Sequence, residues 1–435
     1  MKIFEPKILT SFKGYTGKQI VSDIVAGVIV AIIALPLSIA LAIASGATPE
    51  KGLYTAIIAG FFISLLGGSR VNISGPTAAF ATIVAGIIAG YGFDGLVIAT
   101  IMAGILLILM GLLRVGSLIK YIPHTITVGF TAGIAVTLVI GQLKDFLGLT
   151  YPVGTNAIET TEKLALVFEN LGTVNVWAVI VGVIGLAILI FWPFLTKKIP
   201  GSLIAVLVGA LVVALSGIAV NTIGSLYTVT SALPKFSLPE ITVDKIISLL
   251  PSAVTIALLA GIESLLSCVV SDNMINDKHN SNTELIAQGV GNVFVGFFGG
   301  IPATGAIART AANVRNGGKS PLAGITHAIV LLLVLVVLMP YASLIPMPII
   351  ASILFVVAYN MSEWRSFVKI IKKAKWEDIL VLCLTFVLTV VFDLVKAIAV
   401  GMVVHYAIVL VKFLIARRKN KKTQSDEIVE ENIQE

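Results

Sequence analysis

Residues 67–90 read GGSRVNISGPTAAFATIVAGIIAG, and residues 299–318 read GGIPATGAIARTAANVRNGG. Each segment begins with two glycines and contains a proline before a short run that can form a helix. Neither helical run is long enough to cross a bilayer by itself. Non-helical backbone is tolerated at membrane depth only where it is buried in protein or lines a wet cavity, because an unpaired N–H or C=O group costs several kcal/mol in lipid. We therefore expect both segments to lie in the protein interior.

The composition is that of a membrane protein. Hydrophobic residues make up 57% of the 435 positions, the mean hydropathy is +1.02, and charged residues make up 12%, whereas a soluble domain has roughly 25% charged residues. Four long apolar runs, 24–44, 96–113, 177–195 and 322–338, can cross or nearly cross ~30 Å of hydrocarbon as helices. The sequence therefore predicts an all-α integral membrane protein that spans the lipid bilayer.

The apolar runs predict about fourteen transmembrane segments. Their ranges are 20–44, 52–68, 75–90, 95–114, 121–143, 174–195, 201–220, 246–271, 283–299, 303–315, 321–339, 345–361, 377–393 and 395–416. With Met1 inside, the basic residues of the short loops fall in the cytoplasm, as the positive-inside rule requires. These residues are Arg70, Arg114, Lys120, Lys197, Lys198, Lys278, Arg315, Lys319, Arg365, Lys369, Lys372, Lys373 and Lys375. The longer loops, 144–173 and 221–245, then face outward.

Little of the chain is expected outside the bilayer. Residues 1–19 form a cytoplasmic N-terminal segment, residues 20–416 the transmembrane domain, and residues 417–435 a short charged cytoplasmic tail. The predicted location is the inner cell membrane, with several passes and both termini in the cytoplasm.

The two interrupted segments are the third and the tenth of the fourteen, so each is the third member of one half. Because seven spans is an odd number, two such halves insert with opposite topology. This is the inverted-repeat arrangement, in which paired Gly/Pro-interrupted segments mark the binding site. The first repeat covers about 20–220 and the second about 246–416.

The interrupted segments predict an anion site. Helix N-termini near Pro76-Thr77 and Thr304-Gly305 would each present unpaired N–H groups and about half a positive charge to a shared cavity. Gly75 and Gly305 allow a ligand to approach the backbone, after the polar stretch that ends at Ser74. Thr77 and Thr304 add hydroxyl groups. The alternative is that both glycine-proline interruptions are ordinary helix kinks.

Arg309 lies five residues after Thr304, in the second short helix. A cation near the bilayer centre costs roughly 3 kcal/mol even on the lenient insertion scale, so a negative group should lie beside it. The alternative is an arginine that extends to the cytoplasmic edge, since Arg315 follows six residues later.

Glu263 lies well inside the eighth span, where a carboxyl group is a functional candidate by default. It could carry a proton, or a bound cation could keep it ionised. Ser267 lies one turn further on the same face and, with Glu263, could complete an oxygen site for Na⁺. The alternative is a structural ion pair between Glu263 and Arg309.

Other residue types favour no further site. Cys268 and Cys383 lie in apolar runs and predict neither a disulfide framework nor a metal site. The basic residues are not interleaved with aromatic residues, so no nucleic-acid partner is expected. Asp23, Asp393 and Lys396 lie at span ends, where hydration lowers the free-energy cost of a charge. They are interpreted as residues that set the membrane topology or cap a helix. The histidines show no ligand spacing, and no Walker A sequence is present.

Four stretches carry a resemblance to the SulP family of sulfate-permease-like anion transporters. They are ALPLSIALAIASGATPEKGLYTAIIAGF (34–61), LGGSRVNISGPTAAF (66–80), GIESLLSCVVSDNM (261–274) and FGGIPATGAIARTAANVRNGGKSPLAGITHA (298–328). The likeness covers about residues 15–416. It implies a seven-plus-seven inverted repeat with a core and a gate domain, elevator-like alternating access and a homodimer.

The same resemblance implies roles for particular residues. Thr77 and Ala78 in the third segment, with Thr304, Gly305 and Ala306 in the tenth, would hold the anion through backbone N–H groups. Arg309 would supply positive potential. Glu263 would occupy the coupling-acid position, and the coupling-ion site would consist of Glu263, Ser267 and Gly305.

Three features depart from the family pattern. Many members carry Gln after the first-span proline, where this chain has Leu37. Na⁺-coupled bicarbonate relatives have Asp where Glu263 stands, which leaves H⁺ or Na⁺ coupling open. Members usually also carry a C-terminal cytoplasmic STAS domain, which is not part of this sequence.

The expected function is therefore secondary active transport of a small inorganic oxyanion, sulfate or bicarbonate, in symport with H⁺ or Na⁺. No cofactor is expected apart from Na⁺ as a coupling ion, and no enzymatic activity. One alternative is a C4-dicarboxylate substrate. A nucleobase permease would need carboxylates on both the eighth and the tenth segments, and the tenth has Arg309 instead. A passive anion channel would not need Glu263.

Overall fold

The computed structural model describes residues 4–12, 14–117, 123–152, 155, 157–196, 199–392 and 396–414. The predicted tail 417–435 lies outside these residues, as do Lys120, Lys197, Lys198 and Asp393. The chain divides into two compact units, one of residues 1–119 with 136–360 and one of residues 120–135 with 361–435. The interrupted segments and the predicted site residues all lie in the first unit.

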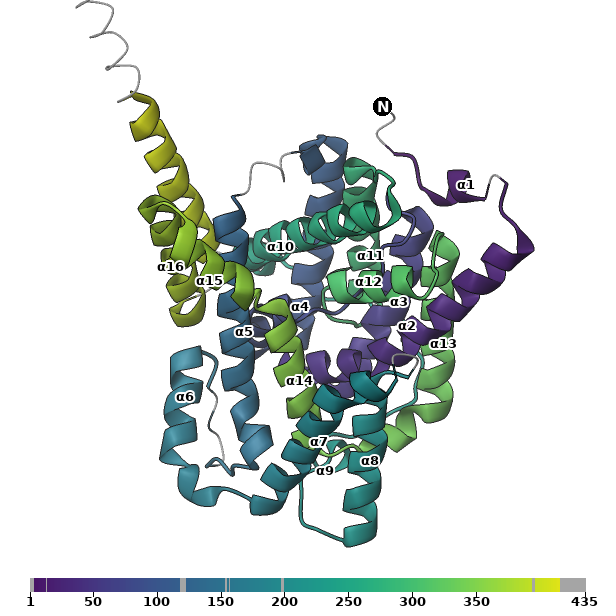
Figure 1. The fold of residues 1–435 in the computed structure, drawn as a ribbon, viewed down its shortest axis with the longest axis vertical. Helices are drawn as coiled ribbons and strands as arrows, with labels where there is room; N and C mark the ends of the chain where they lie inside the picture. Colours follow the sequence, from purple (N-terminus) through teal and green to yellow (C-terminus); the bar gives the residue numbers. More distant parts are fainter. Residues whose placement is uncertain are drawn as a thin grey trace, which may run out of the picture. The chain divides into compact units, whose positions relative to one another are not determined.

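Helices dominate the described residues (Figure 1). In chain order they are α1 (Ile8–Ser11), α2 (Gly17–Ala44), α3 (Pro49–Leu66), η1 (Ala78–Phe80), α4 (Ala81–Leu112), α5 (His124–Leu147), α6 (Thr160–Glu169), η3 (Leu171–Thr173), α7 (Val176–Leu195), α8 (Gly201–Ser216), α9 (Ile223–Leu226), α10 (Val243–Ile275), α11 (Ser281–Phe297), α12 (Ile307–Arg315), α13 (Pro321–Leu338), η4 (Met339–Leu344), α14 (Met347–Met361), α15 (Trp364–Lys373) and α16 (Trp376–Val391). A further helix covers Lys396–Leu414. Two short strands, β1 (Ser74–Gly75) and β2 (Thr304–Gly305), complete the list.

Within the described residues, eight helices are long and apolar enough to cross a membrane. Most helices begin and end within a few residues of the predicted spans, for example α13 over 321–338 against a predicted 321–339. The all-α membrane fold is therefore confirmed. The predicted third and fourth spans join directly, because α4 continues through a kink at Gly92, whose φ of 69° is accessible to glycine at little cost.

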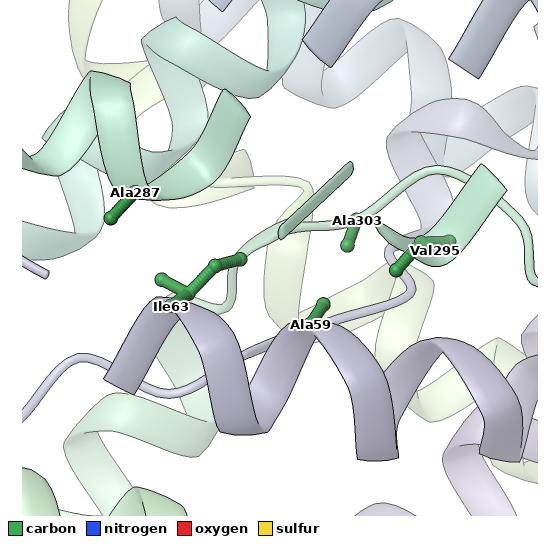
Figure 2. Packing of buried hydrophobic residues seen from close by; sticks show 5 residues of the cluster. All are labelled: Ala59, Ile63, Ala287, Val295 and Ala303. Carbon is green, nitrogen blue, oxygen red and sulfur yellow. The ribbon is translucent and has the colours of Figure 1, made fainter. Parts of the chain in front are cut away.

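The first unit has a core of closely packed helices. α11 packs against α3 and α4, and α13 packs against α2 and α3. Figure 2 shows the side chains between α3 and α11, where Ala59 and Ile63 meet Ala287 and Val295, together with Ala303 from the segment before β2. Such small side chains let helix backbones approach closely, which is how membrane helices gain packing energy.

Asp23 corrects one expectation. Its side chain is fully buried, whereas a hydrated position at a span end was predicted. Its Oδ1 accepts hydrogen bonds from the backbone N–H groups of Lys319 (2.6 Å) and Ser320 (3.3 Å), and its Oδ2 accepts from the hydroxyl groups of Tyr15 and Ser320. Asp23 therefore caps the start of α13 from α2, and only the tertiary packing of these two helices removes it from water.

Candidate functional site

The two interrupted segments meet in the protein interior. β1 pairs with β2 in antiparallel orientation, with Ser74 opposite Gly305 and Gly75 opposite Thr304, and all four residues are buried. The Ala306 N–H extends the contact by donating to the Ile73 carbonyl at 2.8 Å. This confirms that both segments are interior and adjacent. It also excludes the alternative that the two glycine-proline interruptions are ordinary helix kinks.

Each strand leads into a helix. η1 begins at Ala78 and continues into α4, and α12 begins at Ile307. These starts lie one to three residues after the predicted ones, because the residues before them adopt extended backbone to pair. The Thr77 hydroxyl accepts from the Ala79 N–H (3.4 Å), whereas α12 has no side-chain cap. The first-turn N–H groups have no partner inside their own helix, so both starts are electropositive.

Two of the predicted anion donors already have protein partners. The Gly305 N–H donates to the Ser264 hydroxyl at 2.9 Å, and the Ala306 N–H donates to Ile73. The Thr304 hydroxyl lies 2.7 Å from the Ser264 hydroxyl and donates to the Ala260 carbonyl at 3.1 Å. The contacts with Ser264 and Ala260 hold β2 against α10. Anion binding through Gly305 and Ala306 stays a prediction, and it would require their N–H groups to be shared or released.

Arg309 lies beside the first interrupted segment. It is only 1% exposed, which excludes an arginine that extends to the cytoplasmic edge. Its Nη2 donates to the Ser38 hydroxyl and to the Pro76 carbonyl, both at 3.3 Å. A Cβ at position 75 would lie 2.1 Å from Nη1, so the close approach of the guanidinium requires Gly75.

Much of the Arg309 guanidinium has no partner. Its Nε and Nη1 have no hydrogen-bond acceptor in the described part of the chain, although a guanidinium carries five donor hydrogens. The ion pairs of the described residues are Lys7–Asp277, Arg70–Asp277, His279–Asp272 and Lys412–Glu377, and none of them joins Arg309 to Glu263. A buried charge without a counterion is strongly destabilising. The arrangement can therefore bind an anion between Arg309 and the nearby helix starts.

Glu263 and Ser267, both on α10, contact different partners. The partly buried Glu263 side chain lies near the Thr77 side chain, in the first interrupted segment. The Ser267 hydroxyl donates to Asn72 Oδ1 (2.8 Å) and lies 3.1 Å from the Thr310 hydroxyl. The predicted Na⁺ site at Glu263, Ser267 and Gly305 stays a prediction. Among the described residues no group of three or more His, Cys, Asp or Glu side chains could hold a metal.

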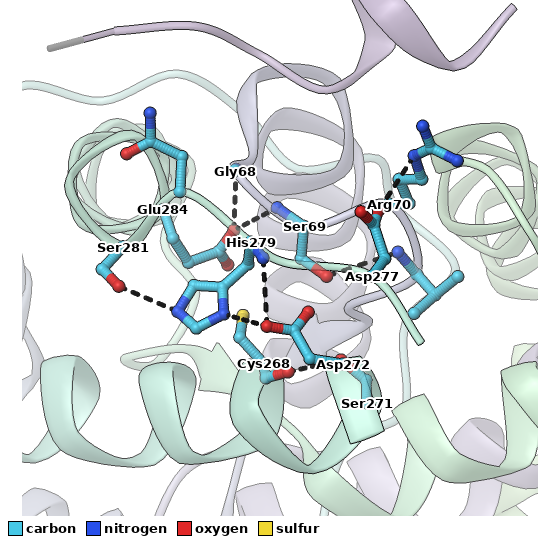
Figure 3. A network of polar contacts seen from close by, with 12 residues as sticks. Gly68, Ser69, Arg70, Cys268, Ser271, Asp272, Asp277, His279, Ser281 and Glu284 are labelled. Carbon is cyan, nitrogen blue, oxygen red and sulfur yellow. Dashed lines mark hydrogen bonds and ion pairs between the residues drawn. The ribbon is translucent and has the colours of Figure 1, made fainter. Parts of the chain in front are cut away.

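A buried polar network behind the strands was missed by sequence reasoning. Glu284 Oε2 accepts from the N–H groups of Gly68 (2.9 Å) and Ser69 (3.2 Å), as Figure 3 shows. Its Oε1 accepts from Asn72 Nδ2 (2.7 Å) and Gln288 Nε2 (3.0 Å). The available signal was polar residues at 284, 288 and 292, which recur every four residues and so lie on one face of α11. This stripe fixes the approach to β1.

Ser38 was also missed. It is buried on α2 and contacts Arg309, two residues after Pro36. Leu37, where many family members were expected to carry Gln, packs instead against the apolar cluster of Val181, Ala205, Ile349 and Ile353. The polar contact from this helix is therefore made by Ser38 rather than by residue 37.

A family comparison matches most of the chain. The model of the sulfate permease family matches residues 20–385. A putative sulfate transporter of Bacillus subtilis, YvdB, is 46% identical over 401 residues, which cover 91% of this chain and 74% of that protein. The bicarbonate transporter BicA of Picosynechococcus is 33% identical over 420 residues, which cover 94% of this chain and 73% of that protein.

Solved structures show the same fold. The transmembrane domain of a cyanobacterium bicarbonate transporter, BicA, matches with a TM-score of 0.78 and 32% identity, over 88% of this chain and 98% of that one. The murine Solute Carrier 26 family member A9 anion transporter matches with a TM-score of 0.84, over 93% of this chain and 71% of that one. At 18% identity the second match shows the fold alone.

Proposed function

The chain belongs to the sulfate permease family, a family of anion transporters, and on that premise we propose that it is a secondary active transporter of a small inorganic oxyanion. Sulfate and bicarbonate are the substrates named for its relatives. Those names favour neither a C4-dicarboxylate nor a nucleobase, the two alternatives that the sequence left open.

One observation carries the proposal. Arg309 is buried, has no carboxylate partner among the described residues, and keeps Nε and Nη1 unpaired between α2, the first interrupted segment and α12. A fully ionised guanidinium needs an anion there. Sulfate and bicarbonate each carry two oxygens on one central atom, and such a pair can accept two parallel N–H bonds from a guanidinium.

The proposed substrate site lies between the two interrupted segments. It is formed by Ser74 to Ala78 from the first and by Thr304 to Ala306 from the second, with Arg309 as the positive charge. Anion binding there would be favoured by the helix starts at Ala78 and Ile307. We propose that the site alternates between the two sides of the membrane by an elevator-like motion.

Coupling is proposed to act through Glu263. Its side chain lies near Thr77, which belongs to the substrate segment, so the charge of the carboxyl group acts on that segment at short range. Either a proton or a Na⁺ ion with oxygen ligands from Glu263, Ser267 and Gly305 would neutralise it when the anion binds. Both ions therefore belong in the test.

Uptake into proteoliposomes tests the function. Purified protein is reconstituted, and uptake of labelled sulfate, bicarbonate, fumarate and uracil is measured under an imposed H⁺ gradient, an imposed Na⁺ gradient or neither. We expect sulfate or bicarbonate to accumulate only under one of the gradients. Rapid equilibration without any effect of a gradient would indicate a channel, and no uptake above protein-free liposomes would overturn the proposal.

Location and assembly complete the proposal. We expect the protein in the inner cell membrane as a homodimer with both termini in the cytoplasm, because the basic residues of the short loops fall on one side and because the family likeness suggests a dimer. Light scattering of the detergent-solubilised protein would give the mass of the assembly. A monomeric mass at all protein concentrations would contradict the homodimer.

A further inference from the structure

The connection between α5 and α7 borders an open cavity that the substrate site does not use. Its volume is about 370 Å³, and α4, α5 and α6 all contribute to its lining. The polar side chains in the lining are those of Lys144, Tyr151, Thr155 and Lys163. We refer to it as the large cavity.

A second space of about 40 Å³ adjoins the large cavity, because Gly141 and Lys163 line both. This small cavity is also lined by Ala78, where η1 begins, and by Gln142 on α5. The two cavities therefore connect Lys163 to the start of the helix at the proposed substrate site. One water needs about 10–15 Å³ of such volume, so the small cavity has room for a few waters and the large one has room for a hydrated oxyanion.

Lys163 is a cation without a protein partner at this place. It lies half-buried on α6, and its ammonium group forms no hydrogen bond or ion pair with any described residue. Burial lowers the pKa of its ammonium group, and the neighbouring Glu162 only partly opposes that effect. A negative ion in the large cavity would offset this desolvation penalty by its attraction to the ammonium group.

Two neighbours strengthen the assignment. Lys144, also in the lining, is exposed and lies 4.8 Å from the centre of the Tyr151 ring, so a second positive charge stands at the rim. Gln142 is 4% exposed, and its Oε1 has no hydrogen-bond partner among the described residues. A half-turn of this amide would present its NH₂ group to an anion in the small cavity.

We propose that Lys163 and Lys144 form a second oxyanion site in the large cavity, at which the substrate is captured before it passes Gln142 and reaches the helix start at Ala78. This rests on the proposed transport of an oxyanion. The site has one full positive charge at its inner end and one at its rim, whereas the substrate site combines helix starts with Arg309. The capture site is therefore expected to raise the rate at which the anion associates with the protein.

Kinetics of reconstituted variants test the capture site. Lys163→Ala should raise the KM for sulfate or bicarbonate roughly two- to tenfold at low ionic strength with kcat nearly unchanged, and the difference should shrink at high salt. Lys163→Arg keeps the charge and should behave as the wild type. Lys235→Ala removes an exposed lysine from another loop and serves as the matched control. An unchanged KM in Lys163→Ala would overturn the site.

Chemical restoration separates charge from structure. In a Cys268→Ser, Cys383→Ser background, Lys163→Cys is modified in detergent and then reconstituted. A 2-aminoethyl methanethiosulfonate adduct restores a positive charge and should restore the KM, whereas a 2-sulfonatoethyl adduct should raise it further. Equal effects of the two adducts would overturn the proposal. If the wild type transports the anion but the two adducts give the same KM, only the capture site is wrong. If the wild type shows no uptake, the proposed transport function and the capture site are both wrong.

Discussion

Arg309 supplies the positively charged side chain of the proposed substrate site. Its two hydrogen bonds are long, at 3.3 Å, and they leave Nε and Nη1 for a ligand. Lysine could supply the same charge, but only as a point charge without a planar fork of donors. The geometry of the guanidinium, rather than its charge alone, is therefore expected to matter.

Replacement of Arg309 tests this at the level of the residue. Arg309→Leu should weaken oxyanion binding about 10- to 100-fold, because a charge-assisted hydrogen bond contributes about 1.5–3 kcal/mol, and Arg309→Lys should recover only part of the loss. Binding to purified protein by isothermal titration gives the affinity. Arg315→Leu, at the exposed end of the same helix, is the control. Equal affinity in Arg309→Leu and Arg315→Leu would exclude Arg309 as an anion ligand.

Glu263 is the second residue with a separable role. Glu263→Gln keeps the size and polarity of the side chain near Thr77 but cannot bind or release a proton and carries no charge. We expect oxyanion to equilibrate across proteoliposomes while the H⁺ or Na⁺ gradient no longer drives accumulation. Glu240→Gln, in the loop before α10, controls for general effects of losing a carboxylate. Accumulation that still follows the gradient in Glu263→Gln would rule out coupling through this residue.

At the level of elements, α11 holds the first interrupted segment in place. One carboxyl group, that of Glu284, satisfies the N–H groups of Gly68 and Ser69 and the side-chain amide of Asn72. Asn292 does the same for Ala303 before β2, accepting from its N–H and donating to its carbonyl. The helix therefore fixes both strands through side chains on one face.

Loss of the Glu284 carboxyl should destabilise the whole first unit. Glu284→Ala leaves several buried donors unpaired, at about 1–3 kcal/mol each, whereas Glu284→Gln keeps one acceptor oxygen. We expect apparent melting temperatures in the order wild type, Glu284→Gln, Glu284→Ala, measured by intrinsic fluorescence in detergent. Glu169→Ala, on the exposed surface of α6, should leave the melting temperature unchanged. A Glu284→Ala protein as stable as wild type would show that water satisfies these donors instead.

At the level of the whole molecule, substrate should stabilise the fold, because the site joins segments that are far apart in the chain. A ligand at 100 times its Kd adds about 2.7 kcal/mol to the free energy of unfolding. We expect sulfate or bicarbonate to raise the apparent melting temperature relative to gluconate at equal ionic strength. The Arg309→Leu variant should show no such increase. An equal shift in both proteins would indicate a general salt effect.

The membrane fold, the positions of the long helices and the two interrupted segments can all be predicted from the amino-acid sequence. Apolar run length and helix-breaking residues are local properties, so the predicted 20–44 and 201–220 lie close to the observed Gly17–Ala44 and Gly201–Ser216. Arg309 and Glu263 were identified because an ionisable residue inside a span is conspicuous in the sequence.

The assembly of the site depends instead on how the helices pack in three dimensions. The strand pairing of Ser74 and Gly75 with Thr304 and Gly305, the contact of Arg309 with Ser38, and the burial of Asp23 all join residues more than 200 positions apart. No local pattern specifies which polar side chain meets which backbone group at such a separation. Their positions follow from the close packing of α2, α3, α10, α11 and α13, which excludes water and leaves each buried polar group to find its partner within the protein.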